Sequence, residues 1–188
     1  MAPPTLFEPE LFGDDEGKLL PLARDDELFI LERAKISFQV KTSTRETFKS
    51  KGRIYCTTQR IIFVADRPST QHGREFGAFE VPLAHMSDEK FNQPIFGACS
   101  ISGLVSTAGN KASDGDGEQF VWKVIFSNGG TGVVLPVFLR LLEKRKKQET
   151  IDMSFMQNQN KAFVDPNDPT VIYIAQPVKP RAAASAST

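Results

Sequence analysis

The basic residues between positions 41 and 53 are the side chains whose types and spacing best suit a chemical task. Clustered lysines and arginines can bind several phosphate oxygens through charge-assisted hydrogen bonds, as an inositol phosphate headgroup requires. The acid Glu46 lies inside the cluster, and a solvated basic surface without a specific ligand is the competing interpretation. The candidate ligand-binding residues are Lys41, Arg45, Lys49, Lys51 and Arg53.

A second candidate is the apolar triplet Pro94, Ile95 and Phe96, which falls in a predicted loop. Large apolar residues in a loop could insert into a groove of a partner protein or into a lipid interface. Apolar residues beside strands are more often part of the core, which is the alternative for this triplet. We treat the three residues as candidate partner contacts.

Three further motifs favour structural roles. The basic run 144–147 could touch nucleic acid or a membrane, but it suits the negative end of a helix dipole better. The stretch 114–118 has oxygen ligands and glycines but lacks the twelve-residue EF-hand pattern, so calcium is not expected. The glycines of 129–132 lack the Lys-Ser/Thr of a nucleotide loop. We therefore expect no metal, no cofactor and no direct binding of nucleic acid.

No combination of residues indicates catalysis. The two histidines, His72 and His85, are isolated, and neither they nor Cys56 and Cys99 have the spacing of zinc ligands. No nucleophile–base pair or Gly-x-Ser-x-Gly motif is present, so we expect a non-enzymatic protein with no catalytic residues. Two cysteines, no signal peptide and no apolar run long enough to span a membrane favour a cytoplasmic or nuclear location.

Alternating apolar residues predict a mainly β fold. An apolar run lies at 28–31, and a tight Thr58-Gln59 turn is expected to join two of the strands into a hairpin. Polar loops are predicted at 41–51, 67–74 and 109–117. The predicted strands lie within 35–40, 52–57, 60–65, 76–81, 86–91, 98–106 and 119–126.

The period then changes to that of a helix. Apolar residues recur at helical spacing from Val134 to Leu142, and Pro136 is tolerated best in a first turn, which places the helix start at 133–135. About seven antiparallel strands and one C-terminal helix together predict a two-sheet β-sandwich or barrel capped by that helix.

The chain divides into three predicted regions. Residues 1–24 form an acidic, irregular leader; residues 1–30 carry eight acidic and two basic side chains, although the whole chain has a net charge of zero. Residues 25–148 form the folded domain. Residues 149–188 form a C-terminal extension with a possible strand at 170–175 and a flexible tail at 179–188.

One segment carries a resemblance to a known family. Lys51-Gly-Arg-Ile-Tyr-Cys-Thr-Thr-Gln-Arg-Ile-Ile-Phe-Val-Ala65 has the glycine, aliphatic-Tyr strand, Thr turn and Arg-led apolar strand of a GRAM domain. With 81–83, Gln93-Pro-Ile-Phe-Gly-Ala98 and Phe126-Ser-Asn-Gly-Gly130, the segment resembles the WW-domain-binding protein 2 family over about residues 27–147. The resemblance implies a pleckstrin-homology-like fold of seven antiparallel strands closed by a C-terminal helix.

The resemblance also implies a function. Members of this family are adaptors, and the best-known ones act as transcriptional co-regulators through Pro-Pro-x-Tyr motifs. This chain departs from that pattern, because Pro3-Pro4 has no following tyrosine and Tyr173 follows Thr-Val-Ile. We therefore expect a protein-interaction adaptor whose partner does not bind through that motif. The alternative is a module that binds phosphoinositides or anionic membranes through residues 41–53.

Overall fold

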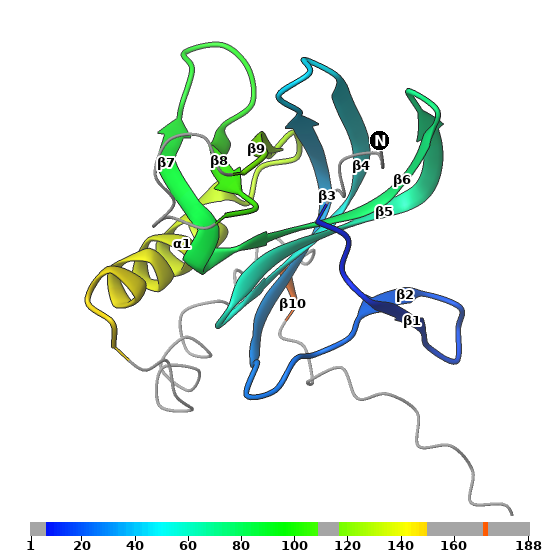
Figure 1. The fold of residues 1–188 in the computed structure, drawn as a ribbon. Coiled ribbons are helices and arrows are strands. Elements are labelled where there is room, and N and C mark those ends of the chain that lie inside the picture. The colour runs from blue at the N-terminus through cyan, green and yellow to red at the C-terminus, as the bar shows by residue number, and fades with distance from the viewer. Residues whose placement is uncertain (1–6, 109–116, 150–170, 173–188) are drawn as a thin grey trace, which may run out of the picture.

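The computed structural model describes residues 7–108, 117–149 and 171–172, and they form mainly antiparallel β-structure with one long helix (Figure 1). Seven strands make a continuous sheet in the order β6-β5-β4-β3-β9-β8-β7, and β10 (Val171–Ile172) pairs with β3 outside that order. The strands are β3 (Phe29–Lys41), β4 (Thr47–Thr57), β5 (Arg60–Gln71), β6 (Arg74–Pro82), β7 (Met86–Asn92), β8 (Ser100–Ser106) and β9 (Gln119–Ile125), and the helix is α1 (Thr131–Lys146).

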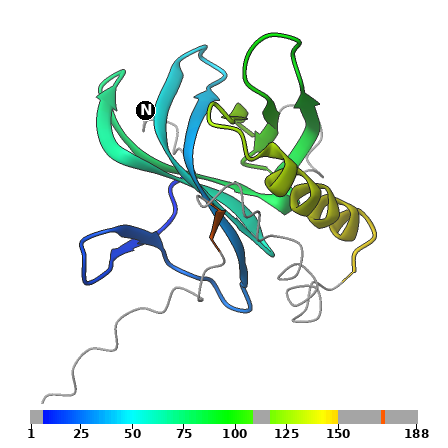
Figure 2. The same ribbon diagram turned by 180° about the vertical axis from the view of Figure 1, so that it is seen from behind.

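Strand β3 belongs to both halves of the fold. It pairs with β4 along most of its length but with β9 only from Ser37 to Lys41, so the sheet turns a corner there (Figures 1 and 2). The end strands β6 and β7 are joined by the short helix η1 (Leu83–His85), and the described residues show no pairing between them. The fold is therefore sandwich-like and not a closed barrel. The predicted mainly β class, with a C-terminal helix, is confirmed.

Phenylalanine rings fill the space between the layers. Phe38 stacks on Phe63 with ring centroids 4.6 Å apart, and Phe76, Phe79 and Phe120 extend the cluster. The predicted alternation in β3 is confirmed, because its even-numbered residues from Ile36 to Val40 are buried and the residues between them face outward.

Helix α1 closes one end of the sandwich. Its buried face comprises Val133, Val134, Val137, Phe138, Leu141 and Leu142. The helix begins at Thr131, earlier than predicted, because Pro136 inside it lacks only one backbone donor and the other bonds of the first turns form.

Gly130 precedes the helix at φ 88°, and a Cβ there would overlap the guanidinium of buried Arg33. That guanidinium donates hydrogen bonds to the carbonyls of Asn128 and Gly129, at 3.2 and 2.8 Å.

Two predicted loops are wrong in extent. The loop expected at 41–51 is only a turn at 42–46, and residues 47–51 belong to β4. The prediction missed this part of the strand because the residues that alternate with its basic side chains are Phe48, Ser50 and Gly52, of which only Phe48 is a large apolar residue. The loop expected at 67–74 is mostly the end of β5 and the start of β6, where residues 66–70 are exposed on both faces. Pro68 is tolerated there because β4 pairs with β5 only as far as Ala65. Three predicted segments lie outside the described residues, apart from Gly117 and Glu149. They are the loop at 109–117, the C-terminal extension before residue 171 and the tail at 179–188.

The N-terminal segment is not the irregular leader that the sequence predicts. Strands β1 (Leu11–Gly13) and β2 (Leu19–Pro21) form a hairpin on the outer face of the sheet. There Leu11, Leu20 and Ala23 pack against a second apolar cluster formed by Phe29, Tyr55, Ile62 and Val64. Phe7 packs edge-on against Phe79 and Phe120, and its carbonyl accepts a hydrogen bond from the backbone of Glu80 at 2.8 Å.

A buried ion network fixes this segment to the sheet. The guanidinium of Arg60, which is 1 % exposed, donates to both carboxylate oxygens of Glu27 at 2.8 and 2.9 Å. It also donates to the Glu80 carboxylate and to the carbonyl of Leu22. Arg24 bonds the other oxygen of Glu80. Residues 22–27 are therefore held by charges from the β4–β5 hairpin and from β6.

The network also sets the protonation of Glu27. Burial alone would raise the pKa of its carboxyl, but hydrogen bonds from Arg60, from the Arg24 backbone and from the Thr57 hydroxyl outweigh burial and lower the pKa below its ordinary value of 4.5. The carboxylate therefore stabilises the fold above about pH 4.5, and this stabilisation is lost as the pH falls through the lower, folded-state pKa.

The packing of α1 predicts a contrast between neighbouring residues. Phe138→Ala should lower the free energy of unfolding by about 3–5 kcal/mol, because its ring is buried against Trp122. Leu139→Ala, which changes a residue that is 52 % exposed, should alter it by less than about 0.5 kcal/mol. Urea unfolding monitored by circular dichroism measures both, and equal losses would show that the helix packs on another face.

The ion network predicts an acid-dependent loss of stability. Glu27→Gln should lower the free energy of unfolding at pH 7 by about 3–5 kcal/mol, because the Arg60 charge remains buried. The variant should then lose less stability than the parent when the pH falls from 5 to 3, since it lacks the titrating carboxylate. Urea unfolding at both pH values measures the effect, and Glu75→Gln at an exposed position of β6 is the control. Parallel pH profiles for Glu27→Gln and the parent would contradict the assignment.

Candidate functional site

Three of the predicted basic residues share one outer face of the sheet. Lys49 and Lys51 alternate on β4 and lie opposite Gln39 and Ser37 of β3, while Lys41 lies opposite Thr47. All three lysines are exposed, and no ion pair joins them to an acid within the described residues. Directly opposed and diagonal neighbours on an antiparallel pair lie within about 8 Å, so the three ammonium groups can act together.

A fourth lysine joins this face, and the sequence did not identify it. Lys123 of β9 lies opposite Gln39, on the side away from Lys49. Its position far along the chain hides this neighbourhood, and only the register of β9 against β3 reveals it. We call Lys41, Lys49, Lys51 and Lys123 the lysine face.

Arg53 follows the same alternation on β4 but is engaged elsewhere. Its guanidinium lies 3.5 Å from both the Glu32 and the Asp66 carboxylates, and Lys18 contacts Glu32 at 3.0 Å. Burial alone would lower the pKa of Arg53, but the neighbouring Tyr55 hydroxyl and the two carboxylates outweigh burial and raise it. The charge of Arg53 is therefore neutralised within the fold.

Arg45 also lies apart from the lysine face. It occupies the turn between β3 and β4 with a positive φ of 67°, and its backbone N–H donates to the Thr42 carbonyl at 3.0 Å. Its side chain is exposed at the end of the strands. The structure thus groups three of the five predicted cations, places Arg45 at their border and assigns Arg53 a structural role.

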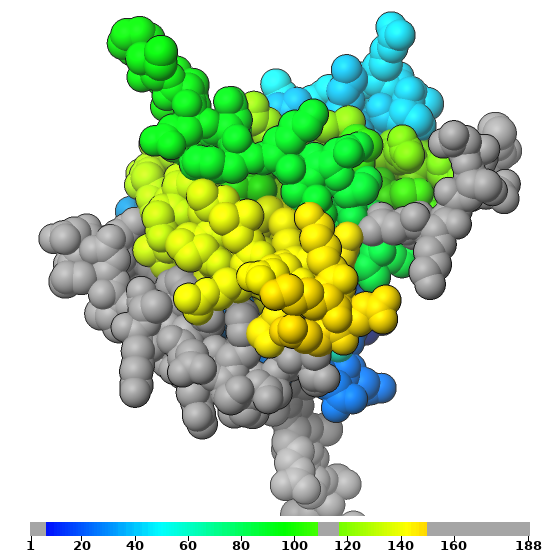
Figure 3. Space-filling view, turned by 90° about the vertical axis from the view of Figure 1, so that its left-hand side faces the viewer, coloured from blue at the N-terminus to red at the C-terminus, as the bar shows by residue number. Residues whose placement is uncertain are grey.

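The loop between β7 and β8 carries the most exposed large apolar side chains of the described residues. Ile95 is 94 % exposed and Phe96 is 92 % exposed, whereas the next, Leu139, is 52 % exposed. No charged residue lies between Asn92 and Cys99. The loop projects from the body of the molecule (Figures 1 and 3). The core interpretation is therefore wrong for Ile95 and Phe96, while Pro94 is half-buried.

The apolar loop and the lysine face lie on different elements of the sheet. Lys49 and Lys51 belong to β4, which β3 and β9 separate from β8, the strand into which the loop continues. Lys123 belongs to β9, which pairs directly with β8, and it lies opposite Ser102 there. Lys49 and Lys51 are therefore the members of the lysine face that are set apart from the strands of the loop.

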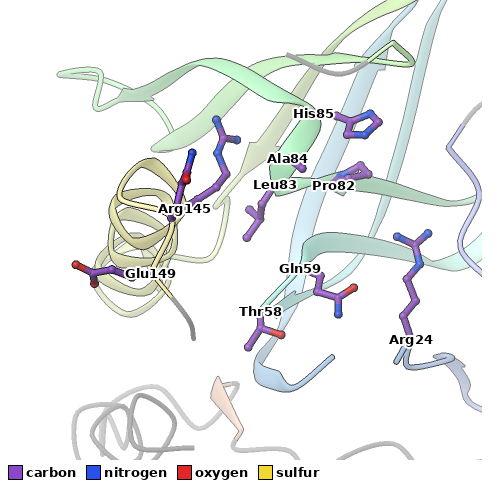
Figure 4. Close-up of a pocket in the computed structure, with 10 residues that line it drawn as sticks. Arg24, Thr58, Gln59, Pro82, Leu83, Ala84, His85, Arg145 and Glu149 are labelled. Carbon is purple, nitrogen blue, oxygen red and sulfur yellow. The ribbon is translucent and has the colours of Figure 1, made fainter. Parts of the chain in front are cut away.

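A cleft of about 580 Å³ lies between the end of α1 and the β4–β5 turn. Figure 4 shows Arg145 and Arg24 on opposite sides of it, with His85 near the top. Arg145 donates to the carbonyl of Met86 at 3.0 Å, the imidazole of His85 bonds the carbonyl of Ser106 at 2.9 Å, and Arg24 bonds Glu80. These polar side chains fix the walls of the cleft to their own neighbours.

The more buried of the two cysteines is part of the core. Cys56 is fully buried, and burial raises the pKa of its thiol to about 12, so it is protonated at neutral pH. Within the described ranges, no three His, Cys, Asp or Glu side chains gather as a metal site would require. Nor is any described helix long and apolar enough to cross a bilayer.

Comparison with known proteins gives distant relatives. No family model matches the chain. A UPF0664 stress-induced protein of Schizosaccharomyces pombe is 28 % identical over 102 residues, which is 54 % of this chain and 55 % of that protein. WW domain-binding protein 2 of Mus musculus and that of Homo sapiens are each 28 % identical over 105 residues, 55 % of this chain and 37 % of each relative. The matched region thus spans about half, or less, of these relatives. The chain is a mainly β protein with weak similarity to WW domain-binding protein 2.

Proposed function

We propose that the chain is a non-enzymatic adaptor module that binds a protein partner through Ile95 and Phe96. The observation that carries the proposal is the exposure of these two adjacent side chains on a projecting loop. An exposed pair of large apolar residues is unfavourable in water, and burying such side chains contributes roughly 1.5–3 kcal/mol each. A partner that covers the loop would gain that free energy.

The chemistry of the loop supports a protein surface as the target. The centres of protein interfaces are depleted of charged residues and enriched in aromatic ones, and the loop from Asn92 to Cys99 has this composition. A few well-packed anchors dominate binding energy, so Phe96 is the expected anchor and Ile95 its neighbour. The two strands that hold the loop belong to the main sheet, and Asn92 pairs with Ser100 at the base of the loop.

The distant relatives support the same role. WW domain-binding protein 2 is named for binding to WW domains, and its similarity to this chain covers about half of the chain. We extend the similarity to a GRAM-type domain in a cytoplasmic or nuclear adaptor that acts as a transcriptional co-regulator. The absence of Pro-Pro-x-Tyr in this sequence makes the β7–β8 loop a better contact candidate than a WW-binding motif.

Substitutions in the loop test this proposal. The double variant Ile95→Ser/Phe96→Ser should lose the partner proteins that the immobilised parent chain retains from cell extract, because the apolar anchors are gone. Quantitative mass spectrometry of the retained proteins measures the effect. Leu139→Ser is the matched control, since it removes an exposed apolar residue from α1. If both variants retained the same proteins as the parent, with unchanged unfolding curves, the loop would not be the contact.

The lysine face favours a second candidate function, the binding of phosphoinositides or anionic membranes. Three exposed lysines on β3 and β4 share this surface with Lys123 on β9. Within the described residues, none of the four forms an ion pair with an acidic side chain. Each lysine near an anionic membrane contributes about 1 kcal/mol of attraction, which salt screens.

Liposome co-sedimentation tests this candidate. The parent chain should bind vesicles containing phosphoinositides saturably and more weakly at higher salt, and Lys49→Ala/Lys51→Ala should reduce the affinity at least roughly tenfold. Lys146→Ala/Lys147→Ala removes the same charge from the end of α1 and should leave binding unchanged. Equal losses in both variants would indicate attraction by total charge and would count against a site on the lysine face.

A further inference from the structure

The first half of β3 has an unusual edge. Strand β4 lies on one side of it throughout, but β9 pairs only from Ser37 onward. A register shift at Ala34 and Lys35, where Lys35 has a φ of 56°, separates the two halves. On the side away from β4, the only described strand beside residues 30–33 is β10, in which Val171 pairs with Arg33 and Ile172 with Glu32 (Figure 2).

This short edge lies between two irregularities of β3. Register shifts against β4 occur at Ile30 and at Ala34–Lys35, and such bulges usually discourage pairing with another chain. The side chains of Ile30 to Arg33 are all at most 5 % exposed, so both faces of the strand are covered while its edge is reached by another strand. The pairing with β10 shows that the edge takes up an added strand at Glu32 and Arg33 despite the flanking bulges.

We propose that the edge of β3 at Ile30–Arg33 is a strand-addition site for an extended segment of a partner protein. In the free chain, Val171–Ile172 occupies this site, so the C-terminal segment acts as an internal competitor. Because β10 pairs antiparallel with Arg33 and Glu32, the edge accepts a strand that runs antiparallel to β3. The site is distinct from the β7–β8 loop and does not depend on it.

The sequence around β10 defines the chemistry of the expected partner. Residues 170–175, Thr-Val-Ile-Tyr-Ile-Ala, contain four β-branched residues, one tyrosine and no charge or proline. Such residues favour a pleated, half-buried strand, and the absence of proline leaves every backbone N–H able to pair. A partner segment should therefore be uncharged, rich in Val, Ile or Thr, and free of proline over about four residues.

The tether makes the competition quantitative. Residues 150–170, a stretch of 21 residues, connect the end of α1 to β10. A tethered segment of this length has an effective concentration on the order of 1 mM. A free peptide with an intrinsic dissociation constant of about 100 µM would then bind the parent chain roughly tenfold more weakly than a chain whose own segment cannot pair.

The test uses the full chain with its own strand disabled. Val171→Pro/Ile172→Pro removes two backbone donors, and Val178→Pro is the control beyond the paired residues. The probe is a fluorescein-labelled peptide of residues 168–176, with a second peptide N-methylated at its Val and Ile as the backbone control. Fluorescence anisotropy should show roughly tenfold tighter binding of the first peptide to Val171→Pro/Ile172→Pro than to the parent or to Val178→Pro, and no binding of the methylated peptide.

Amide hydrogen exchange gives an independent readout. Alternate backbone amides of residues 30–33 point toward β4, and the others point toward β10. The amides that point toward β10 should exchange faster in Val171→Pro/Ile172→Pro than in the parent, and the labelled peptide should restore their protection. Unchanged exchange in that variant, or peptide binding that N-methylation does not affect, would overturn the proposal. Neither result would bear on the β7–β8 loop, because its substitutions are read out by retained partner proteins and not by the β3 edge.

Discussion

The charge of Arg60 is the constraint on which the N-terminal half of this fold depends. Arg60 is 1 % exposed, and the charge of such a buried residue is stable only when acids and carbonyls replace the water it has lost. Glu27 and the Leu22 carbonyl supply these groups from the N-terminal segment and Glu80 supplies another from β6, and Arg24 bonds the other oxygen of Glu80. Satisfying one buried charge thus brings the N-terminal segment, the β4–β5 hairpin and β6 to one place.

Once the N-terminal segment is fixed, it covers surfaces that the sheet leaves apolar. The β1–β2 hairpin buries the outer cluster around Tyr55 and Ile62, and Phe7 reaches the inner cluster at Phe79. Arg33 of β3 fixes a later segment in the same way, because its hydrogen bonds to the Asn128 and Gly129 carbonyls hold the start of α1. Two buried arginines therefore connect the sheet to the elements that close it.

The sequence predicted the elements whose burial follows a simple period. The alternation in β3 and β9, the Thr58-Gln59 hairpin and the apolar face of α1 are all present. It failed where burial is not periodic: β5 beyond Ala65 is exposed on both faces, and the β1–β2 hairpin is too short to show alternation. For the candidate sites, composition identified the basic residues and the apolar loop. The spacing of residues along the chain could not show that Lys123 lies on the lysine face or that Arg53 forms an ion pair with Glu32 instead. Both depend on contacts between strands that are distant in sequence.

The bonds of Arg33 also bear on how quickly the chain can fold. They join residues that lie 95 and 96 positions apart, and the Arg24–Glu80 pair spans 56. The chain must close these long loops before the contacts stabilise it, and a fold rich in such contacts has a high contact order. We therefore expect folding on the millisecond-to-second timescale typical of all-β domains. Helix α1 should dock only after β3 has paired with its neighbouring strands.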